Sequence, residues 1–366
     1  MDQRVKNVIV ALALLLFGLT AYYLSNIVAY ILIAAVMSLI GSPLTQQFQR
    51  IHYKRFRIGK SAAAFLTILA LWFGLIGFFS FLIPLVASEV NQLSNINVYD
   101  VVNYLNSSLE KIQSSYPSLV SNITHNASIE SYLKMQLSGF VNFGQVSSVF
   151  GSIATVIGNL FLMFFSVSFI LFFFLKEEGM FGKWIILLSP VKFEERVAGV
   201  LESISKLLKR YLMGMLLQML GIMILSTLGF TIIGMGFSHA VVVGVFAGLI
   251  NVIPYIGPWI GSLFGIVVVI SNNLNANFMD VTLPLIALVI LVVMVVQFID
   301  NMVFQTIIYS KSIEAHPLEI FFVTMIAGSI AGIPGMILGI PAYTVMRVIA
   351  SEFLSEFKVI KSLTKR

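Results

Sequence analysis

One carboxylate stands inside an apolar stretch of the sequence that carries no other charge. Asp300 is the only acid within the apolar spans, and placing a carboxylate there costs about 3 kcal/mol on insertion scales, so it normally faces the protein interior. Gln297, Asn301 and Gln305 lie within about one helical turn of it and can extend a polar stripe. The group predicts a proton or cation relay. A structural clamp, in which Asp300 pairs with Arg347 or caps interrupted backbone, is the alternative.

Two clusters of proline and glycine interrupt apolar segments in the C-terminal half of the chain. Proline removes a backbone donor and glycine loosens the backbone, so each cluster should end a helix at membrane depth. Bare backbone is tolerated there only where protein or a wet cavity covers it. Ordinary kinks are the alternative interpretation. The pathway residues predicted from these clusters are Asn251, Pro254, Gly257, Pro258, Pro334, Gly335 and Pro341.

The elements that carry these residues occur twice in succession. An unbroken span at 211–234 precedes the broken segment 239–270, and a second span at 283–308 precedes the broken segment 320–349. Paired interruptions in two repeats point to a transport site. If both broken segments are re-entrant helical hairpins, the first opens outside and the second inside, which makes the repeats inverted; the alternative is that both cross the membrane. His316 and Glu319 precede or begin the second hairpin and are interpreted as gate or capping residues.

The composition places the whole chain in a lipid bilayer. Of 366 residues, 58% are hydrophobic and only 10% are charged, and the mean hydropathy is +0.98. Too few polar residues remain to coat a water-soluble core. Charge-free runs at 7–49, 61–88, 135–175 and 211–279 are long enough for helices that need about 20 residues to cross. The sequence predicts an all-α polytopic membrane protein, not a β-barrel.

Basic residues set the predicted topology. The segment 46–60 carries five bases and no acid, so it should be cytoplasmic, together with both termini. The predicted location is the bacterial inner membrane. The predicted parts are a three-span scaffold (1–86), an extracytoplasmic amphipathic helical domain (87–145), a fourth span (146–175), a cytoplasmic interfacial helix (176–209), a transport unit (210–350) and a basic tail (351–366).

The sequence lacks the residues that several classes of function require. The sequence has no cysteine, which excludes disulfides and thiolate metal sites, and isolated histidines predict no metal site. No phosphate-binding loop for ATP is present. The net charge of +6 follows the positive-inside pattern and indicates no nucleic-acid partner. We therefore expect no enzyme activity and no cofactor.

Five motifs follow one another along the chain: Arg210-Tyr211-Leu212-x-Gly214, Asn251-x-Ile253-Pro254-Tyr255-Ile256-Gly257-Pro258, Gln297-x-x-Asp300-Asn301, His316-Pro317, and Gly332-Ile333-Pro334-Gly335-Met336 with Gly339-x-Pro341. In this order they resemble the signature of the autoinducer-2 exporter (AI-2E) family, also called PerM-like permeases. The resemblance implies seven or eight membrane segments, secondary transport and a homo-oligomer, with a pentamer as the expected assembly. Export of autoinducer-2 and sodium/proton exchange are both attributed to the family.

These observations favour a secondary transporter that exports a small polar solute, such as an autoinducer-2-like signal, by alternating access. Its expected partners are the lipid bilayer, the solute, and Na⁺ or H⁺. One alternative is a sodium (lithium)/proton antiporter of the same family. Two others are a non-transporting scaffold or regulator, in which the broken helices are dry kinks, and a passive channel.

Overall fold

The computed structural model describes residues 23–53, 56–94, 104, 107–108, 153–177, 179–253, 257–306 and 317–353. The predicted first span, most of the 87–145 domain, Pro254, His316 and most of the basic tail lie outside them. Apart from one short pair of strands, β1 (His52–Tyr53) and β2 (Phe56–Arg57), every regular element described is helical. The predicted all-α polytopic class is confirmed, since five helices are long and apolar enough to cross a membrane: Asn26–Arg50, Lys60–Glu89, Val191–Ile232, Phe278–Gln305 and Gly335–Phe353.

The chain divides into two compact units. Unit 1 comprises Met1–Leu75 and Ile153–Ser205, and unit 2 comprises Ile76–Ser152 and Lys206–Arg366. Two long helices, α3 (Lys60–Ser94) and α10 (Glu194–Ile232), contribute residues to both. Since α10 runs unbroken through residue 210, the 194–209 part of the predicted interfacial helix and the span after it form one continuous helix, whereas residues 180–188 form a separate short helix.

Unit 1 is built on α2 (Ser25–Arg50), the first part of α3, α8 (Ile153–Lys176) and the short helix α9 (Met180–Leu188). Its core lies between α2, α3 and α8 and includes Ala34, Ala64 and Leu171, all fully buried. Small residues let membrane helices approach closely. The Thr45 and Thr67 hydroxyls then hydrogen-bond across α2 and α3 at 2.8 Å. Close packing and one polar contact thus fix this helix pair.

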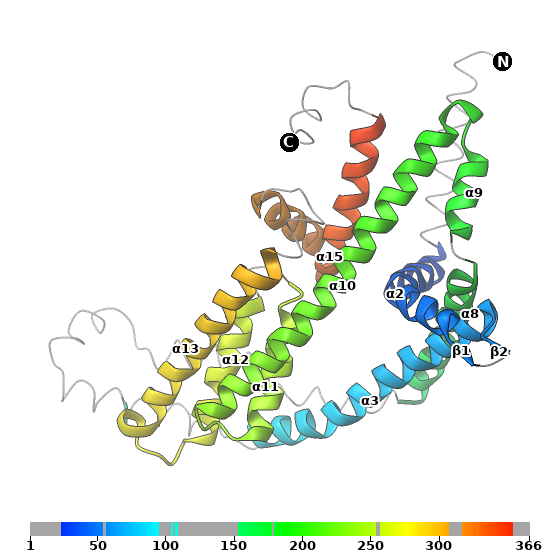
Figure 1. Ribbon diagram of the computed structural model, residues 1–366. Helices are drawn as coiled ribbons and strands as arrows, with labels where there is room; N and C mark the ends of the chain where they lie inside the picture. The colour runs from blue at the N-terminus through cyan, green and yellow to red at the C-terminus, as the bar shows by residue number, and fades with distance from the viewer. Residues whose placement is uncertain are drawn as a thin grey trace. The chain divides into compact units, whose positions relative to one another are not determined.

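The first broken segment of unit 2 forms a hairpin of α11 (Phe237–Ile250) and α12 (Gly257–Asn272), which lie side by side in Figure 1. The Phe246 and Phe264 ring centroids are 4.4 Å apart. The first turn of α12 lies so close to the end of α11 that a Cβ added at Gly257 would be 2.5 Å from the Ile250 carbonyl oxygen. Glycine is therefore required there, and the hairpin predicted from the proline and glycine cluster is seen in the contacts.

The second broken segment, α15 (Pro317–Phe353), also folds back on itself. The helix bends at Gly332, whose φ of +60° is one that L side chains rarely adopt. Beyond the bend, a Cβ added at Gly339 would be 2.8 Å from the Ala327 Cβ, although residues twelve apart in one straight helix are about 18 Å apart. The two arms of α15 are therefore antiparallel neighbours, as the sequence predicts.

The helices that precede the two hairpins pack against each other in opposite directions. A Cβ added at Gly229 of α10 would be 2.5 Å from Val292 of α13 (Leu283–Ile299). Gly221, two turns earlier in α10, instead faces Phe304, beyond the end of α13. Rising numbers on α10 thus meet falling numbers on α13. An antiparallel pair of leading helices is what two inverted repeats would require.

Candidate functional site

Asp300 is fully buried where α13 meets α10. The Gln218 Nε2 of α10 donates to Asp300 Oδ1 at 2.7 Å, and the Gln305 Nε2 donates to Asp300 Oδ2 at 2.9 Å. Both carboxyl oxygens are therefore satisfied by neutral amide groups. Among the described residues, Asp300 has no basic partner.

The backbone itself brings Gln305 to Asp300. Residues Asp300–Gln305 wind as a π-helical turn, whose backbone bonds span five residues in place of four. In a regular α-helix a residue five positions later lies about 140° around the axis. The Thr306 hydroxyl bonds the Asn301 carbonyl at 3.0 Å with the same five-residue spacing. The wide turn thus aligns Gln305 with the carboxylate, and such turns occur frequently at functional sites.

The predicted polar stripe separates into two groups. Gln297 Nε2 donates to Asn301 Oδ1 at 3.2 Å, and Asn301 is exposed. Neither of these residues bonds Asp300. Arg347 lies instead 3.9 Å from Glu319, so the alternative in which it pairs with Asp300 is not what the structure contains. The sequence predicted Gln297 and Asn301 as the neighbours of Asp300, but Gln218 donates the hydrogen bond to its Oδ1 instead.

The other predicted pathway residues belong to the hairpins. Asn251 and Pro258 are partly buried at the two sides of the first break, and Asn251 closes α11 by donating its backbone N–H to Ala247. Gly335 and Pro341 lie in the second arm of α15, and a Cβ on Gly335 would clash with the Ala327 carbonyl. The Pro334 side chain lies outside the described residues. These residues shape the two hairpins and form no hydrogen bond to Asp300.

Glu319 joins the two arms of the second hairpin. Tyr343 donates its hydroxyl to Glu319 Oε2 at 2.6 Å, and Arg347 Nη1 lies 3.9 Å from the same oxygen. Glu319 is on the first arm and its partners are on the second. It therefore fastens the arms at their open ends, a position that fits either predicted role, gate or cap.

A second buried carboxylate was not predicted from the sequence. Glu89, near the end of α3, is 3% exposed, and its Oε2 lies 2.6 Å from the His239 Nδ1 at the start of α11. The other oxygen, Oε1, has no partner among the described residues. His239 also lines a cavity of about 190 Å³ beside Asn272 and Asn273. The sequence offers one signal for this pair. Glu89 closes the apolar run 61–88, and His239 opens the broken segment 239–270 on the same predicted side of the membrane.

The His239 cavity also fixes how the first hairpin lies. His239 precedes most of α11, and Asn272 and Asn273 end α12, yet all three line one cavity. The α11–α12 hairpin therefore begins and ends at the same side of unit 2. Thr282, ten residues after Asn272, precedes α13 and is buried. Its hydroxyl forms a hydrogen bond of 2.6 Å with the Tyr104 hydroxyl.

Chemically, the Asp300 site can accept a positive charge. A buried carboxylate is stabilised by hydrogen bonds, but amides donate no net charge, so burial of the anion stays costly without a counter-charge. A proton or a small cation at the carboxyl group removes that cost. Within the described residues, no group of three or more His, Cys, Asp or Glu side chains that could hold a metal ion is present.

Most of the chain is similar in sequence to one family of known proteins. Residues 11–355 match the AI-2E family transporter family. Two curated relatives are YueF and YrrI of Bacillus subtilis (strain 168), both named as proposed transport proteins. YueF is 27% identical over 361 residues, which cover 93% of this chain and 86% of YueF. YrrI is 26% identical over 211 residues, which cover 58% of this chain and 56% of YrrI.

Proposed function

Because the chain belongs to the AI-2E transporter family, we propose that it is a secondary transporter that exports a small polar signal molecule of the autoinducer-2 type. The proposed mechanism is alternating access around the α11–α12 and α15 hairpins. The proposed membrane is the bacterial inner membrane, with both termini in the cytoplasm, and the proposed assembly is a homo-oligomer. The observation that carries the coupling step is the buried Asp300, held by two neutral amides with no described basic partner.

Asp300 would serve as the coupling group. In the structure its carboxyl group has no exposure to solvent, and we assign this arrangement to a closed state. A proton or cation that binds there lowers the cost of burial, and a ligand shifts a conformational equilibrium only through such a difference between states. Occupancy of Asp300 would then favour the closed arrangement, and loss of the ion would favour opening. The hydrogen bonds of Gln218 on α10 and Gln305 on the π turn would change with occupancy of Asp300, which would couple ion binding to the positions of both helices.

The same carboxylate supports a second candidate, exchange of Na⁺ or Li⁺ for H⁺. A single site that holds either a proton or a cation is sufficient for such exchange, because the two ligands compete. The candidates differ in whether a furanone solute moves with the ion. In the antiporter, ion flux proceeds without any organic solute.

Reconstituted vesicles separate these candidates. Full-length protein in proteoliposomes would be given imposed pH, Na⁺ or Li⁺ gradients, with and without the furanone signal. We expect saturable solute flux that depends on a gradient and is lost in Asp300→Asn. Ion exchange of equal rate without solute favours the antiporter. Solute flux that neither saturates nor depends on a gradient would establish a passive channel.

Thiol accessibility tests the non-transporting alternative, since the native chain has no cysteine. Asn251→Cys and Pro341→Cys introduce thiols beside the two breaks at partly buried positions. Val289→Cys, in the fully buried core of unit 2, is the matched control. A wet pathway makes the first two react with water-borne reagents while the control stays protected. If all three stay protected under every gradient, the hairpins are dry kinks and transport through them is refuted. Gly257 and Gly335 are unsuitable positions because a Cβ there meets backbone.

A further inference from the structure

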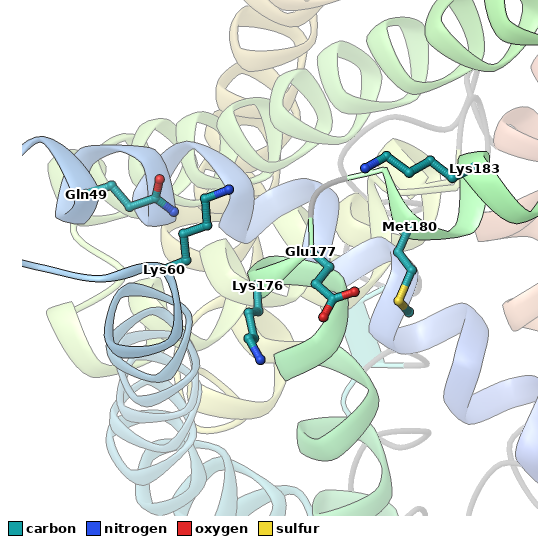
Figure 2. A pocket seen from close by; sticks show the side chains of 6 residues that line it. All are labelled: Gln49, Lys60, Lys176, Glu177, Met180 and Lys183. Atoms are coloured by element: carbon teal, nitrogen blue, oxygen red, sulfur yellow. The ribbon is translucent and has the colours of Figure 1, made fainter.

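Unit 1 contains a basic cavity of about 390 Å³ that takes no part in the proposed transport site. It lies among the ends of four helices and is drawn in Figure 2. Lysines dominate its charged lining, with one glutamate among them. The residues that line it are Gln49, Lys60, Lys176, Glu177, Met180 and Lys183.

The cavity has an excess of positive charge. Three lysines against one glutamate give a net charge of +2, and none of these lysines forms an ion pair with a carboxylate in the described part of the chain. Figure 2 shows Lys60 and Lys183 reaching toward the same space from opposite sides, with the Gln49 amide beside Lys60. Single lysines at span ends commonly extend into water. Here Lys60 and Lys183 converge from separate helices (Figure 2), whereas the Lys176 ammonium lies 5.9 Å from the Phe172 ring centroid. The convergence of two ammonium groups favours an anionic occupant.

The backbone around the cavity contributes helix dipoles of both signs. Lys60 is the first residue of α3 and Met180 is the first residue of α9. Helix starts present unbonded N–H groups and attract anions. Neither helix has an acidic residue in its first turn, and no side chain caps α9. Two other helices end beside the same cavity, α2 at Arg50 and α8 at Lys176, and helix ends carry the opposite partial charge. The helix dipoles therefore offset one another, and the lysines set the sign of the field.

The position of the cavity identifies the level of the membrane at which it lies. Three apolar helices end or begin there: Asn26–Arg50 next to Gln49, Lys60–Glu89 at Lys60, and Leu162–Lys176 at Lys176. The ends of membrane-crossing helices lie at the level of the lipid headgroups. The loop from 50 to 60 adds further basic residues at this end. An anion found at this level in a bacterial membrane is the phosphate of a lipid.

The adjoining helix α9 also suits a lipid neighbour. Trp184, Leu187 and Leu188 are 59%, 80% and 87% exposed. A short helix with exposed tryptophan and leucine lies at the boundary between headgroups and acyl chains. A free phosphate in water would gain nothing from this surface, whereas the acyl chains of a phospholipid would cover it.

We propose that the cavity lined by Lys60, Lys176 and Lys183 binds the phosphate of an anionic phospholipid headgroup, with the lipid tails against α9. Lys60 and Lys183 hold the phosphate from two sides. Basic pockets between membrane helices on the cytoplasmic side are suited to such headgroups.

The test is native mass spectrometry of delipidated full-length protein titrated with phosphatidylglycerol, phosphatidylcholine and inorganic phosphate. We expect phosphatidylglycerol to bind most tightly. In a Lys60→Gln and Lys183→Gln double variant its affinity should fall by about tenfold or more, which is what two lysines at an anionic surface imply. Lys192→Gln with Lys206→Gln is the charge-matched control, because these two exposed lysines do not line the cavity.

A Lys60→Arg and Lys183→Arg variant keeps both charges and should keep the preference for phosphatidylglycerol. It also separates loss of the site from loss of fold in the glutamine variant. Equal binding of phosphatidylglycerol to wild type and the glutamine variant overturns the proposal. So does an equal affinity for phosphatidylcholine. Inorganic phosphate that binds as tightly as the lipid overturns the lipid assignment.

Discussion

The described part of unit 2 buries two carboxylates, and their surroundings differ in kind. Asp300 is fully buried and both of its oxygens accept hydrogen bonds from neutral amides. Glu89 is buried to almost the same degree, but one of its oxygens faces the ionisable His239 and the other has no described partner. Within the described residues, Asp300 is thus satisfied in hydrogen bonds and uncompensated in charge, whereas Glu89 has a neighbour that can compensate its charge. The difference teaches that burial alone does not identify a coupling site.

The largest expected effect comes from removing the charge of Asp300 while keeping its shape. Asp300→Asn should lower gradient-driven flux by about a hundredfold, equivalent to about 2.7 kcal/mol in the barrier, because the site can no longer bind a proton or cation. Flux would be measured in proteoliposomes under an imposed gradient. Glu89→Gln is the matched control and should retain most of the flux. An equal loss in both variants would break the comparison.

The next effect concerns the pairing of Glu89. His239→Ala removes the only ionisable partner described for Glu89 and leaves an unpaired buried carboxylate. We expect the free energy of unfolding to fall by about 2 kcal/mol, less than for a fully buried pair because His239 is partly exposed. The measurement is thermal unfolding in detergent. His239→Gln, which can still donate a hydrogen bond, should recover part of the loss, and a stable His239→Ala would show that the pair contributes nothing.

Removing one amide donor from Asp300 should have a smaller effect. Gln218→Ala or Gln305→Ala leaves one buried carboxyl oxygen without a donor, which costs about 1–3 kcal/mol. We expect the Gln218 change to have the greater effect because Gln218 is buried and Gln305 is only partly so. Thermal unfolding and flux would both be recorded. Additive losses in the double variant would contradict a shared site, because residues in one network do not act independently.

The smallest effect is expected at the exposed amide pair. Gln297→Ala or Asn301→Ala removes a hydrogen bond that lies on the surface of α13 and its π turn. Changes of this kind alter the free energy of unfolding by less than about 0.5 kcal/mol. Flux should stay close to that of wild type. A loss of flux comparable to that of Gln218→Ala would restore the single polar stripe suggested by the sequence.

The sequence predicts the membrane class and the two hairpins well because hydrophobic length and helix-breaking residues are local signals. Proline and glycine at 254–258 and 332–335 indicate where each helix must stop, and the hairpin contacts at Gly257 and Gly339 follow. Asp300 is identified by its isolation in an apolar span. Its role in coupling stays a prediction, as do the boundaries of the predicted domains.

The partners of each carboxylate could not be predicted, since they depend on which helices meet. Gln218 lies 82 residues before Asp300, and Glu89 lies 150 residues before His239. No periodicity within one segment encodes such pairs. The division of the polar stripe has a different cause, because helical spacing assumes 3.6 residues per turn and the backbone departs from it at Asp300.

The π-helical winding of residues 300–305 determines whether Asp300 Oδ2 has a hydrogen-bond donor. If the backbone rewound to the ordinary helix, Gln305 would lie about 140° around the helix axis from Asp300. No side-chain rotation would be needed to separate the two groups. Oδ2 would then lack its donor and be open to an incoming ion. A shift of a single residue in helical phase would then connect backbone conformation to the proposed ion affinity of a group that no solvent reaches.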